Sequence, residues 1–289
     1  LGDVHLGDLG RQSGMLIYEL HEENPSLPFF DENYSKEYPN IGLTAQDLGR
    51  MYPLASKKAK EDPVIMEKVR EISSLVEKGY KPYLELWKQM LEVSSKEIRK
   101  VYDKLNCHFE IWDGELESLN YVPNVMEIMK KNLYESDGAL IMDVKEKSDT
   151  LEVPPLMVIK SNGSSIYATR DLATLYKRIN KYNPDEIWYV VDERQSLYFT
   201  QVFRGAYKSG LVPGNVSLKH FGFGTINGKD GKPFKTRDGG VMELSMLIEM
   251  IRKEIYPKIK EDIPLEERNK IADTLAIATL KYADLLPYR

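Results

Sequence analysis

An alternation of apolar strands and helices between residues 137 and 223 constrains the fold most strongly. Four short runs have strand character: 139–144, 156–160, 185–191 and 216–223. The run at 185–191 is apolar on both faces, as in a buried parallel strand. Helical spacing follows at about 169–181 and 194–209, the latter closed by Gly210. Strands joined through helices are typical of parallel sheets, so the sequence predicts an α/β fold with a mostly parallel sheet.

Helical sequence flanks this region on both sides. Apolar residues recur at helical spacing over three further stretches: about 44–134, 242–257 and 265–286. Ser94 and Glu97 have the spacing of a capping box, which predicts a helix start. Gly79 and Gly138 occupy positions where helices should stop. The sequence therefore predicts a helical subdomain before the sheet and a helical segment after it.

Composition excludes several classes of protein. One cysteine in 289 residues cannot form an internal disulfide or a thiolate-rich zinc site. A reducing, cytoplasmic setting is therefore expected. No apolar run approaches the roughly 18 residues of a membrane span, so no membrane span is expected. The four histidines lack metal-ligand spacing, and no metal site is expected. The formal net charge of -5 means that any nucleic-acid surface has to be local.

Two polar segments lie where ligands bind an open parallel sheet, beyond the carboxyl ends of its strands. Tyr167 is expected to end a strand and Asp171 to lie in the next helical turn, facing the same way. A carboxylate beside a phenol suits a cationic ligand. The alternative is that Asp171 complements the helix dipole and Tyr167 is core. Gln195 is expected in the first turn of the helix after strand 185–191, where its amide could hydrogen-bond a ligand. The alternative is that this is an ordinary, solvated helix start.

A third segment runs from His220 through Phe223 into a glycine-rich loop. Gly222 and Gly224 leave room for a flat group, such as a nucleobase, against the backbone. The loop then carries four cations against one acidic residue: Lys229, Lys232, Lys235 and Arg237. A mobile cationic loop suits a polyphosphate, and the alternative is a solvated charged turn. The spacing of a Walker phosphate loop is absent.

These segments, in this order, resemble the motifs of arginyl-tRNA synthetases, a class I family. The similar pieces are Tyr167-x-Thr-Arg-Asp171, Asp192-x-x-Gln195, Gly222-Phe-Gly224 and Gly231-Lys-Pro-Phe-Lys-Thr-Arg237. Val4-His5-Leu6-Gly7-Asp8 looks like the segment that follows the first nucleotide-binding helix of the family. The resemblance implies a Rossmann-like catalytic domain with a mostly parallel sheet, a helical insertion and C-terminal helices.

The resemblance also implies four parts along the chain. Residues 1–20 would be the N-terminal part of the catalytic domain, and 21–134 a mostly helical insertion. Residues 135–240 would be the second half of the Rossmann-like catalytic domain, and 241–289 a helical connector leading to the anticodon-binding domain. The family's His-x-Gly-His signature would lie before Leu1. We therefore expect a piece of a longer chain, with little or no activity alone.

The activity implied is ATP-dependent activation of arginine to arginyl-adenylate and its transfer to tRNA(Arg), by a monomeric enzyme. Tyr167, Asp171 and Gln195 would line the arginine pocket. The four cations of 229–237 would be the catalytic residues, stabilising phosphate charge, with Mg2+ on the ATP phosphates. Residues that would bind ATP are His220, Gly222, Phe223 and Gly224. Tyr198 stands where the family commonly has a His. The alternative is a truncated synthetase-like paralogue acting as a non-catalytic arginine- or nucleotide-binding module.

Overall fold

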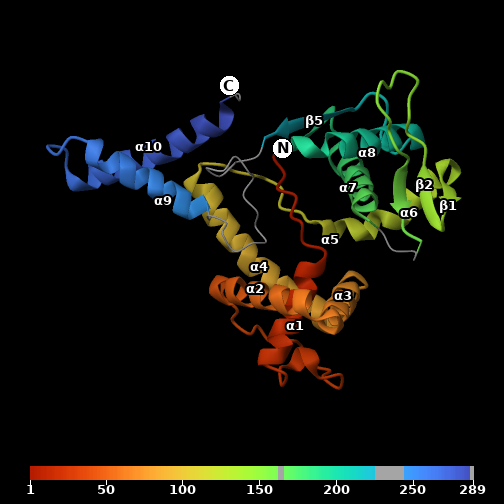
Figure 1. The fold of residues 1–289 in the computed structure, drawn as a ribbon, viewed down its shortest axis with the longest axis horizontal. Helices are drawn as coiled ribbons and strands as arrows, with labels where there is room; N and C mark the ends of the chain where they lie inside the picture. The colour runs from red at the N-terminus through yellow and green to blue at the C-terminus, as the bar shows by residue number, and fades with distance from the viewer. Residues whose placement is uncertain (162–165, 225–243, 287–289) are drawn as a thin grey trace.

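A computed structural model of the 289-residue chain describes residues 1–161, 166–224 and 244–286. Three groups of elements are visible in Figure 1. Helices from the first third of the chain form one group, and strands and helices from the middle form the second. A pair of helices near the C-terminus forms the third, at the opposite end of the long axis from the strands. The strands and helices of the middle group position the candidate site.

Four helices build the first group: α1 (Arg11–Glu23), α2 (Ala45–Glu61), α3 (Pro63–Glu77) and α4 (Lys81–Lys104). The short turn η1 (Pro28–Phe30) lies in the connection between α1 and α2. Apolar faces of these helices form one core, which includes Ile17 of α1, Met51 of α2, Val76 of α3 and Met90 of α4. The spacing of apolar residues predicted helices from about residue 44 onward, and α2, α3 and α4 confirm this prediction.

A capping box forms in this group, but not at the residues where the sequence predicted one. A capping box starts α2, because Thr44 Oγ1 accepts from the Asp47 N–H at 3.2 Å and Asp47 accepts from the Thr44 N–H at 2.9 Å. The capping box predicted at Ser94 and Glu97 is wrong, since both residues lie inside α4. Ser94 Oγ instead donates back to the carbonyl of Met90 at 3.0 Å, which lets the helix continue.

The strands form two small sheets in the described part of the chain. One sheet is antiparallel and contains β1 (Tyr134–Ser136), β2 (Ala139–Met142) and β3 (Leu156–Ile159). The other pairs β4 (Glu186–Asp192) and β5 (Ser217–Phe223) in parallel. The predicted parallel pairing therefore holds for β4 and β5 but not for β2 and β3. No helix crosses from β2 to β3, and parallel neighbours need such a crossover.

Gly138 does not end a helix, contrary to the prediction. Asp137 and Gly138 both have positive φ, at 49° and 76°, and form the two-residue turn between β1 and β2. An Asp-Gly pair in this conformation is favoured in tight hairpins, because its twist matches that of the strands. Gly79 and Gly210, in contrast, follow α3 and α8 with positive φ, as predicted for helix ends.

Two helices cover the middle strands: α7 (Tyr167–Tyr182) and α8 (Ser196–Ser209). Leu172 and Leu175 of α7 and Val202 of α8 are buried in one core with Val158 of β3. Shorter elements complete this group: α5 (Glu115–Ser118), η2 (Leu119–Tyr121), α6 (Val122–Met129), η3 (Lys130–Asn132) and η4 (Glu193–Gln195). The helices predicted at about 169–181 and 194–209 are thus confirmed.

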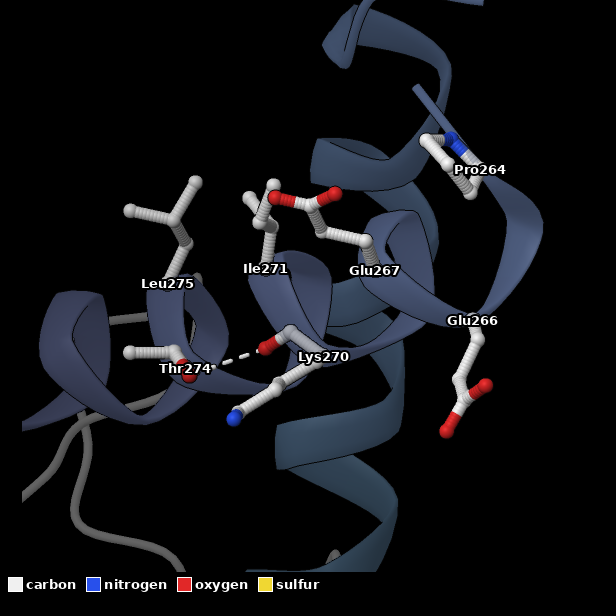
Figure 2. Close-up of a pocket in the computed structure, with 7 residues that line it drawn as sticks. All are labelled: Pro264, Glu266, Glu267, Lys270, Ile271, Thr274 and Leu275. Carbon is white, nitrogen blue, oxygen red and sulfur yellow. Dashed lines mark hydrogen bonds between the residues drawn. The ribbon is translucent and has the colours of Figure 1, made fainter.

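The third group contains α9 (Leu244–Ile255), η6 (Tyr256–Lys258) and α10 (Leu265–Leu285). Arg252 of α9 joins the two helices by donating to Asp273 at 2.6 Å and to Asn269 at 2.7 Å. Figure 2 shows a pocket along α10, lined by Pro264, Glu266, Glu267, Lys270, Ile271, Thr274 and Leu275. Across the three described stretches of the chain, no helix combines the length and apolar character needed to cross a membrane.

Candidate functional site

The start of α7 carries the first pair of candidate residues. Tyr167 is the first residue of this helix rather than the end of a strand, and Asp171 follows one turn later. The side chain of Thr169 fixes the helix start, because it accepts from the Ile166 N–H at 3.1 Å and donates to the carbonyl of Val158. Tyr167 is 62% exposed, so the alternative that it is a core residue does not hold. The two side chains lie on one face of α7, at the spacing predicted.

Asp171 is partly buried and bonded to a neutral group. Its Oδ2 accepts a hydrogen bond from the hydroxyl of Tyr198, on α8. Burial raises the pKa of Asp171, and the hydrogen bond from Tyr198 opposes that rise. No cation makes an ion pair with this carboxylate among the described residues. Burial without a counter-charge disfavours the ionised carboxylate, and a cation bound beside it would favour that form.

The two arginines near Asp171 are directed to other partners. Arg178 donates to Asp3 at 2.5 Å and to the Tyr189 hydroxyl at 3.0 Å. Arg170 Nη1 lies 2.9 Å from Glu115 Oε2, and its guanidinium lies 4.8 Å from the centre of the Tyr167 ring. Within residues 1–161, 166–224 and 244–286, Asp171 therefore has no cation paired with it, even though two guanidinium groups are close.

Gln195 lies beyond the end of β4, as predicted. It is the last residue of η4 and the cap of α8, and its side chain is exposed. The turn is set by Asp192, whose Oδ1 accepts from the Arg194 N–H at 2.8 Å. Gln195 has no hydrogen bond to Tyr167 or Asp171 in the described structure. Tyr198, three residues later on α8, is the side chain that links this segment to Asp171.

The end of β5 lies beside the end of β4 at one sheet edge. His220 is paired with Tyr189 in the register, and its ring stacks on Phe199 of α8 at 5.4 Å. The side of Gly222 that a Cβ would occupy is filled by Glu193, whose carboxyl carbon would lie 2.7 Å away. The carboxyl group is the far end of an exposed, flexible side chain and can move aside, whereas the Glu193 Cα, 2.9 Å from such a Cβ, is backbone. A nucleobase placed there would displace the Glu193 side chain. The exposed residues at this end are Gly222, Phe223 and Gly224.

The four predicted catalytic cations lie outside the described residues: Lys229, Lys232, Lys235 and Arg237. Their role stays a prediction. In the ranges 1–161, 166–224 and 244–286, no group of three or more His, Cys, Asp or Glu side chains is placed to hold a metal ion.

The N-terminal segment packs against the site from the side of α7. Val4 and Leu6 donate backbone hydrogen bonds to the carbonyls of Ile111 and Asp113, at 3.0 and 2.9 Å. Neither ring nitrogen of the partly buried His5 has a hydrogen-bond partner in the described structure. Burial first, and then the nearby Arg178, lower the pKa of His5 to about 4. The imidazole is therefore neutral in the folded chain at ordinary pH.

The low pKa of His5 predicts a pH-dependent stability. Between pH 6.5 and about 4, the unfolded chain binds a proton on His5 that the folded chain does not. As the pH is lowered through this window, the unfolding free energy of the chain should therefore decrease relative to that of His5→Gln. The decrease should be at most about 1.4 kcal/mol per pH unit. Urea denaturation from pH 4 to 7.5 measures the difference. Other charged groups near His5 are Asp3, Asp113 and Lys177.

Glu115 provides a control of opposite sign for the His5 experiment. Its contact with Arg170 is not aligned as a hydrogen bond, so burial dominates and raises the pKa of Glu115 to about 7. The folded chain then keeps a proton on Glu115 that the unfolded chain releases between pH 4.5 and 7. Relative to Glu115→Gln, the chain should lose stability as pH rises. If stability rose with pH in both comparisons, the Glu115 assignment would be contradicted; if it fell with pH in both, the His5 assignment would be contradicted.

Several residues of the site were not predicted as contacts. Tyr198 stood out in the sequence only as a departure from a family pattern, and nothing in its spacing indicated Asp171 as its partner. The Arg178 bond to Asp3 joins residues 175 positions apart. The buried Lys177 likewise pairs with Asp113 at 2.5 Å and Glu117 at 2.6 Å. The only sequence signal was that α7 carries four cations: Arg170, Lys177, Arg178 and Lys181.

Comparison with known proteins decides the family. Residues 3–289 match the family model described as tRNA synthetases class I (R), catalytic domain. The chain belongs to this family. Curated relatives named Arginine--tRNA ligase include that of Alkaliphilus oremlandii, 46% identical over 290 residues, and that of Francisella tularensis subsp. holarctica, 43% identical over 289 residues. These alignments cover 99% of this chain but 49% and 48% of the relatives, so the chain spans about half the length of the curated relatives it matches.

Solved structures of the same family share the fold. The arginyl-tRNA synthetase of Plasmodium falciparum matches with a TM-score of 0.73 at 23% identity, covering 100% of this chain and 45% of that one. The Thermus thermophilus arginyl-tRNA synthetase matches with a TM-score of 0.67 at 17% identity, covering 96% and 50%. At these identities the likeness supports the fold alone. The arginyl-tRNA synthetase family inferred from the sequence motifs is confirmed.

Proposed function

We propose that the chain forms the arginine-recognition part of an arginine–tRNA ligase, which activates arginine with ATP and transfers it to tRNA(Arg). The carboxylate of Asp171 carries this proposal, since it is partly buried and lacks a cation among the described residues. A planar guanidinium matches a carboxylate through paired N–H donors, whereas the ammonium of lysine is a point charge. Tyr167 and Gln195, exposed at neighbouring element starts, would complete the pocket around the ligand.

The ATP would lie at the shared carboxyl edge of β4 and β5. Ligands of open parallel sheets bind outside this edge, which supports a role in ATP binding for Gly222, Phe223 and Gly224 at the end of β5. His220 would act from within the strand, where it is paired with Tyr189. The cations of residues 229–237 would stabilise the charge on the α-phosphate and the departing pyrophosphate, with Mg2+ carried on the ATP phosphates. A cytoplasmic location and a monomeric state remain predictions.

Calorimetry with arginine tests the recognition half of this proposal. The 289-residue chain should bind arginine at least roughly tenfold more tightly than lysine, because only the guanidinium makes the paired contact with Asp171. Absence of arginine binding, or equal affinity for lysine, would contradict the pocket assignment.

Arginine-dependent ATP–pyrophosphate exchange tests the catalytic half. The 289-residue chain should show little or no exchange, because its sequence contains no His-x-Gly-His segment to hold ATP. Exchange at the rate of an intact enzyme would overturn that prediction. The full reading frame of the gene separates the two functions: exchange by its product supports the ligase, whereas arginine binding without exchange supports the non-catalytic module.

A further inference from the structure

The hydroxyl of Tyr198 is the sole hydrogen-bond donor to the carboxylate of Asp171 among the described residues. It donates to Oδ2, and no described residue donates to Oδ1. The two side chains come from different helices, α7 and α8, so the bond also joins the two elements that carry the predicted arginine pocket. One carboxylate oxygen is thus engaged, while the other has no donor from the described residues.

The ring of Tyr198 is held in place by packing. It is partly buried and meets the ring of Phe199 edge-on, with centroids 5.1 Å apart. Phe199 itself is buried and contacts Tyr189 at 5.0 Å, which ties α8 to β4. The hydroxyl is therefore presented to Asp171 from a packed ring, and its hydrogen bond to Oδ2 restricts the orientation of the carboxylate.

We propose that Tyr198 is a positioning residue for arginine recognition, which orients the Asp171 carboxylate toward the guanidinium of the ligand without neutralising it. This inference rests on the proposed function. A neutral donor is the chemistry that the task needs, since a Lys or Arg at position 198 would pair with Asp171 and compete with the ligand. Burial, together with the charge of Asp171, raises the pKa of Tyr198, so the phenol stays protonated and donating.

The surrounding charges are consistent with this role. Arg178 is bonded to Asp3 and Tyr189, and Arg170 is directed to Glu115, so neither guanidinium pairs with Asp171. In the part of the chain that the structure describes, the carboxylate has one hydrogen-bonded partner, which is neutral, and two cations nearby that are paired elsewhere. When Asp171 is ionised, this arrangement leaves its charge available to an incoming cation.

Tyr198→Phe tests the inference, because it removes the hydroxyl and keeps the ring. Arginine should bind about tenfold more weakly, the size expected for losing a hydrogen bond to a charged group. Tyr134→Phe is the matched control, since the Tyr134 hydroxyl donates to Asp143 at 2.7 Å on the distant β1–β2 hairpin. The control should leave arginine affinity unchanged, as measured by calorimetry on the 289-residue chain.

A spectroscopic measurement separates positioning from a merely structural role. With 13C-labelled aspartate, the carboxyl resonance of Asp171 is assigned by its loss in Asp171→Asn. The pKa of Asp171 should rise in Tyr198→Phe, because the lost hydrogen bond favoured the ionised form. It should not change in Tyr134→Phe. Other groups that face this carboxylate are Arg170, Arg178, Glu115 and Tyr189.

Tyr198→His keeps the inference testable where the phenylalanine variant unfolds. A neutral imidazole still donates, so arginine affinity should be retained above about pH 6.5 and fall below it as the ring gains charge. Unchanged arginine affinity in both Tyr198 variants at every pH would overturn the positioning role and leave the proposed function standing. No arginine binding by the unsubstituted chain would overturn both.

Discussion

Asp171→Asn should remove most of the affinity of the chain for arginine. The substitution keeps the shape of the side chain and its bond to Tyr198, but it removes the negative charge. Truncating one partner of a partly buried, hydrogen-bonded charge pair costs about 2–5 kcal/mol. The dissociation constant for arginine should therefore rise by at least roughly 30-fold, as measured by calorimetry at pH 7.5.

Asp143→Asn is the matched control for this prediction. Asp143 also accepts a hydrogen bond from a tyrosine, Tyr134, but it is exposed and lies on the β1–β2 hairpin. The control should bind arginine like the unsubstituted chain and should unfold at nearly the same temperature. Equal arginine affinity in Asp171→Asn and Asp143→Asn would show that the guanidinium is recognised elsewhere.

Most of the helix predictions came from apolar residues that recur at helical spacing. The helix expected at about 169–181 is α7, at Tyr167–Tyr182, and the one expected at about 265–286 is α10, at Leu265–Leu285. The strand at 185–191 corresponds to β4, whose parallel pairing with β5 follows from the crossover helix α8 between them. These elements have strong periodicity and clear end signals, so local sequence is sufficient to locate them.

Strand direction and helix continuity depended on information that local sequence lacks. The antiparallel pairing of β2 with β3 is set by the path of the chain between them, which contains no helix. Ser94 can cap a new helix or bond back to the preceding turn, and the choice depends on whether the apolar face of α4 continues to pack. Both corrections reflect tertiary context overriding a local signal.

Sequence position selected the candidate site residues but did not indicate the hydrogen bonds between them. The rule that ligands bind beyond the carboxyl ends of strands selected Gln195 and Gly222, and the contact between Gly222 and Glu193 brings their two loops together. The bond from Tyr198 to Asp171 joins residues 27 positions apart on two helices. No pattern in one sequence specifies such a pair, because it depends on how α7 and α8 pack.

Gly14→Ala should destabilise the chain, although alanine is the better helix former. Gly14 lies near the start of α1, where an added Cβ would overlap the carbonyl oxygen of Val69 and the hydroxyl of Ser73 on α3. Ser73 donates to that same carbonyl at 2.9 Å, so the obstruction is backbone tied to a buried side chain. Overpacking of this kind costs about 1–3 kcal/mol or more, which exceeds the gain in helix propensity. Urea denaturation measures the loss.

Gly49→Ala makes the same substitution in a helix without the obstruction. Gly49 lies in α2, is exposed, and an added Cβ would meet no atom within 4 Å. This variant should gain about 0.5–1 kcal/mol, because alanine loses less backbone entropy on folding than glycine. If Gly14→Ala lowers the unfolding free energy and Gly49→Ala raises it, the loss at Gly14 is caused by the close approach of α1 and α3. A gain in stability at both positions would mean that α1 can move away from Val69 at little cost, and that this helix contact is not a tight one.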